Sequence, residues 1–414
     1  MGVFVGTKRL QKAAPKNDQR AVVRELVQAV DEALLTAANR KGSPTTPTPT
    51  PLSSVPHQLL SGGDPNVLFV LQAEAGAVQW SDGPVSASTL PTTICSLDAT
   101  TCLIVAFRHA RTHRVALAHF DHGGEQAETG VKMLADLALQ SCQARSTDKE
   151  VLEAYFVGTV QFPKFSQDTL ASVLANMGTI ADVDFHVRLD GCCVWTQNTS
   201  DAHRCVHRGL LVDAKDGSCK PVESDVARAY PEVRLRGLRC MQAEHLTSIS
   251  ISRDEEMLLR RSDASTVATA SAVPWIAATR AHMAAQHGGA LPHLIVIRPF
   301  TWSRFMPDVA RKPMDEFLRM STTPEMEPDD FAVQLKAAIV YGHLYRPEVV
   351  FADSQPLVYA LVAKSQAAGD AARRPGPPPC LTREETDKTD PMVGGKEFDF
   401  VWVQVYPATQ PPVA

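Results

Sequence analysis

The chain has 414 residues and a net charge of −5, and 44% of its residues are hydrophobic against 21% charged. This composition is typical of a soluble globular protein with enough apolar material for one large core or two ordinary ones. The small, mixed charge excludes a strongly basic nucleic-acid binder, and no apolar run reaches the ~18 residues of a membrane-spanning helix. We therefore expect no nucleic-acid partner and no membrane partner.

The N-terminus and the cysteines indicate a cellular compartment. The apolar start MGVFVG is too short for a secretory signal peptide, and Gly6 stands where a myristoylation signal has Ser or Thr. The nine cysteines are odd in number and include no CxxC pair, so each is first interpreted as a reduced, buried thiol. We expect an intracellular monomer that is located in the cytoplasm, with the nucleus as a second candidate location.

The first half of the chain alternates helical and strand patterns. Apolar residues at helical spacing predict a helix from Asp18 to about residue 40, and a Pro/Thr-rich tract follows at 41–62. Short β-branched runs then predict strands, and two amphipathic stretches predict helices. The strands are NVLFVLQ (66–72), CLIVAFRH (102–109), RVALAHF (114–120) and EVLEAYFVGTV (150–160), and the helices span 124–142 and 166–178.

The second half mixes strands, helices and regions without a clear pattern. Residues 182–214 predict successive antiparallel strands with Asp/Gly turns, and 241–290 and 365–395 are expected to be insertions, as is 41–62. Further strands are predicted at 292–300, 347–354 and 398–406, and a helix at 329–345. Because strands and helices do not alternate strictly, we expect one α+β domain over 1–414, a mixed, mostly antiparallel β-sandwich with flanking helices.

The predicted hairpin of the two central strands brings a cysteine and a histidine together. In an antiparallel pair the start of the first strand lies beside the end of the second, so Cys102 is expected near His119. An imidazole within hydrogen-bond reach of a thiol can take its proton and later return it to a leaving amine. A third group should orient the imidazole, and the nearby candidates are Ser96, Asp98, Thr100 and Thr101.

The residue types alone leave alternatives open. From spacing alone, a buried strand residue is the favoured interpretation of Cys102. His119, Asp121 and His122 are metal-ligand types, but an HxxH pair without further ligands is a weak zinc signal, so we expect no metal. The chain contains no Walker motif, nucleophile elbow or HExxH motif, and we expect no cofactor.

Several separate motifs resemble eukaryotic protein N-terminal asparagine amidohydrolases. The segments SLDATTC (96–102), HFD (119–121) and QAETGVKML (126–134) resemble that family's signature region. The resemblance continues in RPFTW (298–302) and STTPEMEPDDF (321–331). Because the motifs occur in the family's order, the resemblance is specific and covers most of the chain outside the three insertions.

The resemblance implies an enzyme that hydrolyses the side-chain amide of an N-terminal asparagine in proteins or peptides. It would produce N-terminal aspartate and ammonia and feed the Arg/N-degron degradation pathway. Cys102 matches the family's essential cysteine. The resemblance therefore favours Cys102 as a nucleophile over its interpretation as a buried packing residue. A weaker similarity to bacterial chemoreceptor glutamine deamidases implies His119 as the base, Ser96 as its orienting group, and the mixed sandwich fold of those cysteine hydrolases. Leu97 departs from the pattern, since the family has an acidic residue there.

The implied reaction sets further requirements on the site. Attack by the Cys102 thiolate would give a thioester, with backbone N–H groups at Thr101 and Cys102 stabilising the oxyanion. The free α-ammonium of the substrate requires a carboxylate partner, and the candidates are Asp98, Asp121 and Glu128. The alternative interpretation of each carboxylate is that it caps a helix or lies on the surface and does not bind the substrate.

Two other functions remain open. One is a protein glutamine deamidase related to the chemoreceptor enzymes, and the other is a non-catalytic binding protein that keeps the fold. Ammonia release from Asn-initiated and internal-Gln peptides separates the two deamidases, and a Cys102→Ala variant tests the binding protein.

Overall fold

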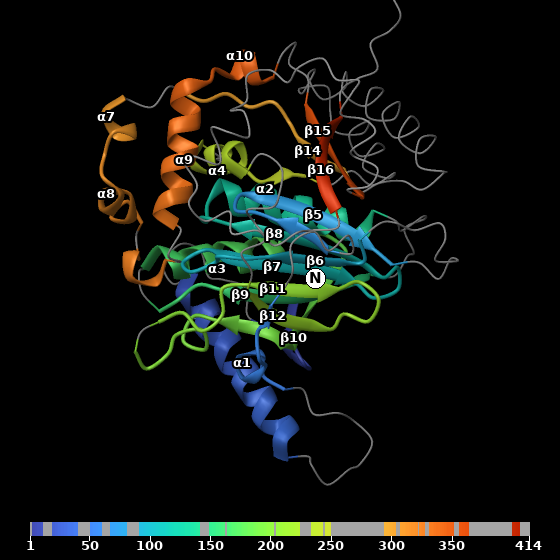
Figure 1. Cartoon of the computed structure of the whole chain (residues 1–414). Helices are drawn as coiled ribbons and strands as arrows, with labels where there is room; N and C mark the ends of the chain where they lie inside the picture. The colour runs from blue at the N-terminus through green and yellow to red at the C-terminus, as the bar shows by residue number, and fades with distance from the viewer. Residues whose placement is uncertain are drawn as a thin grey trace, which may run out of the picture.

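The computed structural model describes most of the chain (Figure 1). The described residues are 2–10, 19–39, 50–59, 67–80, 91–140, 149–161, 164–202, 204–223, 233–242, 245–249, 294–303, 307–321, 323–327, 331–351, 356–363 and 400–405. All of the elements given below lie within these ranges.

Eight strands form a mixed sheet at the centre of the structure. Its order is β13-β5-β8-β7-β9-β10-β1-β2; β7 is antiparallel to β8 and to β9, whereas β9, β10 and β1 run parallel. The bounds are β1 Gly2–Val5, β2 Lys8–Arg9, β5 Glu74–Gln79, β7 Leu103–His109, β8 Arg114–Phe120, β9 Glu150–Gly158, β10 Val183–Val194 and β13 Thr247–Ser248. Every residue of β7 and β8 is buried, as expected for strands that are covered on both faces.

A second sheet of five strands packs against one face of the first. Its order is β3-β12-β11-β6-β4, with bounds β3 Gln58–Leu59, β4 Val67–Val70, β6 Thr93–Ser96, β11 Leu210–Asp213 and β12 Cys219–Glu223. Apolar side chains of both sheets form one buried cluster, to which the large sheet contributes Ile104 and Leu117 and the smaller one Ile94 and Leu210. Burial of apolar surface stabilises such packing by roughly 25 cal/mol per Å².

Three helices cover the other face of the eight-stranded sheet. They are α1 (Gln19–Asn39), α2 (Glu125–Leu139) and α3 (Lys164–Met177). In α1 the apolar residues recur every three or four positions, so that Val23, Leu26 and Val30 are buried together. They join Phe107 and Phe156 of the sheet in a second apolar cluster. The helices and the two sheets are thus successive layers, and α1 projects beyond them in Figure 1.

The C-terminal part adds a three-stranded antiparallel sheet and several helices. The strands are β14 Leu294–Ile297, β15 Leu357–Ala363 and β16 Phe400–Val405. The helices are α4 Val233–Gln242, α7 Pro307–Ala310, α8 Met314–Leu318, α9 Phe331–Leu344 and α10 Pro347–Val350. Short 3-10 turns lie at Pro324–Met326 and, in the N-terminal part, at Leu52–Ser54. Ile295 of β14 packs with Phe69 and Leu97 on the outer face of the five-stranded sheet. Figure 1 shows α7 to α10 along one side of the molecule, beside α4.

The coarse fold expected from the sequence is confirmed. The structure has mixed α/β content, mixed sheets and flanking helices. The predicted first helix is α1, the predicted central hairpin is β7–β8, and the helices predicted at 124–142 and 166–178 are α2 and α3. The strands predicted at 66–72, 150–160 and 292–300 are β4, β9 and β14.

Two predictions are wrong. Residues 182–214 do not form successive antiparallel strands, because β10 is one 12-residue strand of the large sheet and β11 belongs to the other sheet. Gly191 lies inside β10 near a register shift and not in a hairpin turn; a Cβ atom there would lie 2.3 Å from the Tyr155 ring. Of segment 347–354, the described residues 347–351 contain helix α10 in place of a strand, since Pro347 in its first turn favours the start of a helix.

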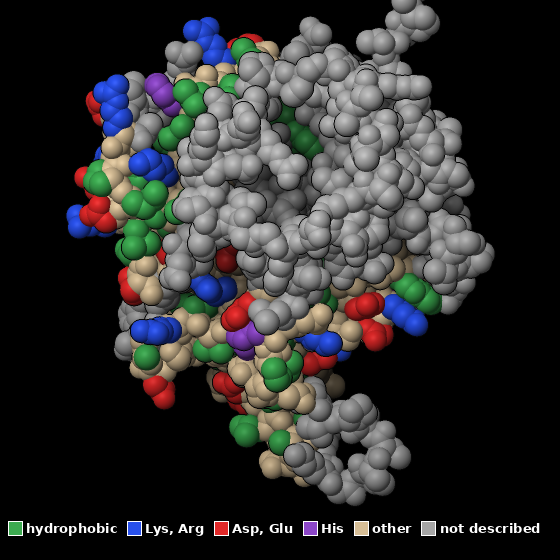
Figure 2. Space-filling view, in the orientation of Figure 1, with side chains coloured by type: hydrophobic (Ala, Val, Ile, Leu, Met, Phe, Trp, Pro, Cys, Tyr) green, Lys and Arg blue, Asp and Glu red, His purple; other side chains and the backbone are tan. Residues whose placement is uncertain are grey.

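Most of the expected insertions fall outside the described residues. This holds for all of 365–395 and for the larger parts of 41–62 and 241–290, so the single-domain organisation stays a prediction. The described ends of the latter two contribute β3 and β13 to the sheets. No described helix is long and apolar enough to span a membrane. Figure 2 shows acidic and basic side chains interspersed over the described part of one face.

Candidate active site

Three side chains from two sheets meet where the sheets are stacked. Ser96 is the last residue of β6, and Cys102 directly precedes β7. His119 of β8 lies opposite Ile104 of β7. Because residues two apart on a strand share a face, Cys102 points with Ile104 and His119 toward the sheet that carries Ser96. The hairpin register therefore brings the cysteine, the histidine and the serine together.

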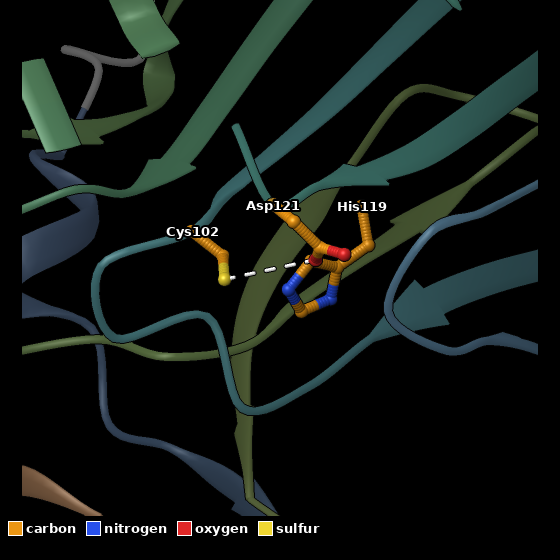
Figure 3. A group of neighbouring side chains, drawn as sticks. All are labelled: Cys102, His119 and Asp121. Carbon is orange, nitrogen blue, oxygen red and sulfur yellow. Dashed lines mark hydrogen bonds between the residues drawn. The ribbon is translucent and has the colours of Figure 1, made fainter. Parts of the chain in front are cut away.

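One hydrogen bond holds the imidazole of His119. Its Nδ1 lies 2.9 Å from Ser96 Oγ, and the residue is only 1% exposed. Its Nε2 is buried and has no hydrogen-bond partner among the described residues. In Figure 3 the ring lies beside Asp121 with one edge toward Cys102. Burial lowers the pKa of His119 to about 3, so the ring is neutral near pH 7.

The loop that carries Cys102 is fixed by its backbone. Thr159 N–H donates to the Cys102 carbonyl at 2.8 Å, and the Ser166 hydroxyl donates to the Thr101 carbonyl at 2.9 Å. Gly158, at the end of β9, has a φ of +107°, and a Cβ atom there would lie 2.4 Å from the Cys102 carbonyl oxygen. Only glycine fits this approach, so the position of the sulfur depends on it.

Asp121 follows β8 and contacts the sulfur directly. The Cys102 thiol donates to its Oδ1 at 3.8 Å (Figure 3), and the Cys240 thiol of α4 donates to its Oδ2 at 3.5 Å. Side-chain atoms of Cys102, His119 and Asp121 all lie within 4.8 Å of one another. Burial raises the pKa of Asp121 to about 7. Burial, followed by the carboxylates of Asp121 and Glu327, raises the pKa of Cys102, so its thiol is protonated in this state.

Three neighbours of the sulfur were not predicted from the sequence. Gln72, in the turn between β4 and β5, donates its side-chain N–H to Cys102 Sγ at 3.7 Å. Cys240 joins the cluster from α4. Glu327 is half-buried, and the Ser321 hydroxyl donates to its Oε1 at 2.5 Å. The motif at 321–331 was the one sequence signal that included Glu327, and no pattern indicated Gln72 or Cys240.

Glu327 lies near a second carboxylate, that of Asp98. Burial raises the pKa of Glu327, and the charge of Asp98 raises it further, whereas the Ser321 hydrogen bond and the charge of Arg208 lower it. Asp98 is exposed and has a φ of 62°, which is uncommon for a residue with a side chain. The loop that carries Cys102 thus contributes one carboxylate, that of Asp98, and the C-terminal part of the chain contributes another, that of Glu327.

The other candidate substrate contacts differ in their surroundings. Thr101 is buried beside the sulfur. The backbone N–H groups of Thr101 and Cys102 have no acceptor among the described residues. Glu128 is exposed on α2, and no hydrogen bond or ion pair joins it to the cluster in the described part of the chain. Leu97 packs into the apolar cluster on the outer face of the five-stranded sheet, so its side chain belongs to the core.

A buried ion-pair cluster fixes α4, the helix that presents Cys240. Glu74 of β5 accepts hydrogen bonds from Arg236 Nε at 2.8 Å and from Arg239 Nη2, and all three side chains are at most 3% exposed. Glu74 Oε2 also accepts the backbone N–H of Leu71 at 2.9 Å. This cluster ties α4, and with it Cys240, to strand β5 of the large sheet.

A comparison with models of protein families identifies the family of the chain. A family model described as protein N-terminal asparagine amidohydrolase matches residues 58–264, which is half of the chain. The matched region contains Ser96, Cys102, His119, Asp121 and Cys240, and it ends before Glu327. No curated protein matches the chain.

Proposed function

The chain belongs to the protein N-terminal asparagine amidohydrolase family, and we propose that it hydrolyses the side-chain amide of N-terminal asparagine in proteins and peptides with Cys102 as its nucleophile. The observation that carries this role is the cluster of Cys102, His119 and Ser96, in which a thiol, an imidazole and a hydroxyl follow one another. Cysteine hydrolases need this order, because the base must reach the thiol and must itself be oriented.

Proton transfer sets the roles of His119 and Ser96. Since the thiol and the imidazole are both neutral before attack, the proton leaves Cys102 as its sulfur bonds to the amide carbon. In the productive tautomer the proton is on Nδ1, and this N–H donates a hydrogen bond to Ser96 Oγ. The lone pair of Nε2 is then free to accept the thiol proton. Protonated His119 then gives that proton to the departing ammonia.

The thioester is resolved by water along the same path. His119 takes a proton from water, the hydroxide attacks the thioester carbonyl, and the products are N-terminal aspartate and the Cys102 thiol. The backbone N–H groups of Thr101 and Cys102, which have no acceptor among the residues that the structure describes, support stabilisation of the oxyanion in both steps. One such donor is typically worth about 3 kcal/mol in the transition state.

Recognition of the free α-ammonium falls to Glu327 and Asp98. The carboxylate of Glu327 lies near the sulfur and that of Asp98 lies near Glu327, and the half-buried Glu327 gains most from a cationic partner. Asp121 is not assigned to the ammonium group, because its two oxygens accept hydrogen bonds from the thiols of Cys102 and Cys240. This assignment explains why the substrate must carry a free N-terminus, since an acetylated one offers no charge to the two acids.

The wider setting follows from the same chemistry. N-terminal aspartate is the substrate of arginylation, so the proposed place of the protein is the deamidation step of the Arg/N-degron pathway in the cytoplasm. The stacked sheets with flanking helices support kinship with the cysteine-hydrolase deamidases. The protein is proposed to work as a monomer.

The nucleophile is tested with Cys102→Ala and a matched control, Cys193→Ala, which removes a thiol buried in the same apolar cluster. Ammonia release and the mass gain of about one dalton on Asn-initiated peptides should vanish in the first variant and persist in the second. Peptides with N-terminal Gln, internal Gln or acetylated Asn should release no ammonia. Release from internal Gln without release from N-terminal Asn would instead establish a glutamine deamidase.

A further inference from the structure

Cys240 adds a fourth potential metal ligand to the side chains around Asp121. Ligand atoms of Cys102, His119 and Asp121 all lie within 4.8 Å of one another, and Cys240 of α4, which is outside that group of three, adjoins it through Asp121. Cys102 Sγ lies 3.8 Å from Asp121 Oδ1, and Cys240 Sγ lies 3.5 Å from the other carboxylate oxygen, Oδ2. In a tetrahedral zinc site with Zn–S of about 2.3 Å and Zn–O of about 2.1 Å, neighbouring sulfur and oxygen ligands lie about 3.6 Å apart.

The imidazole provides an independent observation. His119 Nε2 is buried and has no hydrogen-bond partner among the described residues. Its other nitrogen is bonded to Ser96 Oγ, and such a bond on the far nitrogen is typical of histidines that bind metal. This buried nitrogen, which has no partner in the described part of the chain, lies beside the Cys102 thiol and the Asp121 carboxylate, so a cation can bind it without breaking any existing bond of the ring.

We propose that a zinc-type divalent cation binds reversibly to Cys102, His119, Asp121 and Cys240 and thereby blocks the nucleophile. Thiol and imidazole donors select zinc over magnesium or calcium, which prefer oxygen ligands. On binding, each thiol loses its proton, so that two Zn–S bonds form and two protons are released. Arg239, next to Cys240 on α4, offsets part of the negative charge of the Cys240 thiolate.

This site regulates the chain and is no cofactor site. A bound cation occupies the sulfur that attacks the amide and the nitrogen that takes its proton, so the metal-bound protein is inactive. The inhibitory consequence rests on the proposed function, whereas metal binding does not. The HxxH pattern of the sequence plays no part, because His122 is exposed and only His119 of that pair joins the cluster.

Binding is tested with cobalt on the reduced, metal-free full-length protein. Co²⁺ should give thiolate-to-cobalt charge-transfer absorption and the visible bands of a tetrahedral site at about one equivalent, and Zn²⁺ should abolish both. Cys240→Ser should weaken metal binding at least tenfold, and Cys193→Ala, a thiol outside the cluster, should not change it. Thermal unfolding of both variants checks that they are folded.

Inhibition is measured on the same proteins. Micromolar Zn²⁺ should stop ammonia release from an Asn-initiated peptide, EDTA should restore it, and Cys240→Ser should need at least tenfold more Zn²⁺, each relative to its own metal-free rate. The absence of a tetrahedral cobalt spectrum, or equal metal affinity in Cys240→Ser, would overturn the inference. Metal binding by a protein that releases no ammonia when metal-free would instead overturn the proposed function alone.

Discussion

The hydrogen bond between Ser96 and His119 can be tested with one substitution. Ser96→Ala removes the hydroxyl that lies 2.9 Å from Nδ1 and leaves that nitrogen buried without a partner. In the transition state the ring is protonated, so the lost bond is a charge-assisted one, worth about 1.5–3 kcal/mol. Since 1.4 kcal/mol corresponds to a factor of ten, we expect kcat to fall roughly 10- to 150-fold. The KM should change little, because Ser96 is not placed against the substrate.

Ammonia release from an Asn-initiated peptide, followed at several substrate concentrations, separates kcat from KM in this variant. A matched control is Thr169→Val, which removes a hydroxyl of similar burial that bonds within α3 at 3.2 Å from the Phe165 carbonyl. It should keep the activity while losing a comparable hydrogen bond. If folded Ser96→Ala keeps kcat within about twofold of the wild type, Ser96 does not orient the base.

Three further predictions concern binding, stability and pH. Glu327→Gln should raise KM for Asn-initiated peptides about 10- to 100-fold through loss of a charge-assisted contact, and an unchanged KM would exclude this acid as the ammonium partner. Glu74→Gln should reduce the free energy of unfolding in urea by about 3–5 kcal/mol because it leaves two arginines buried without their carboxylate, whereas Asp315→Asn, in an exposed ion pair, should leave the midpoint unchanged. Burial lowers the pKa of His207 to about 4, so the unfolded chain binds more protons between about pH 6.5 and 4, and stability should fall as the pH drops through that window. His207→Gln should flatten this part of the pH profile of the melting temperature, and a profile with the wild-type slope would contradict the reasoning.

Part of the site could be predicted because it is local. Two β-branched runs separated by a short turn predict a hairpin, and the alternation of side chains then places Cys102 and His119 on one face. The structure has this register, with Ile104 opposite His119. Ser96 comes from the neighbouring sheet, so its closeness in sequence made it one of four candidates to orient the histidine, and only the resemblance to a family singled it out.

The rest of the site depends on contacts between distant segments. Cys240 lies on α4 and Glu327 on the segment before α9, and both are far from Cys102 along the chain. No periodicity encodes such contacts, because they arise when separate elements pack. The errors in the fold have a similar origin: an Asp-Gly pair indicates a turn locally, yet Gly191 accommodates Tyr155 of the neighbouring strand.

Gly158 has a consequence for genetic screens. A mutant with any side chain at this position would displace the Cys102 carbonyl and with it the sulfur, although every reactive group of the site would still be encoded. Such an allele would score as a catalytic null while its protein accumulates and carries an intact nucleophile sequence. A loss-of-function map of this chain should therefore show, besides the peaks at the reactive residues, an equally strong peak at a residue without any side chain.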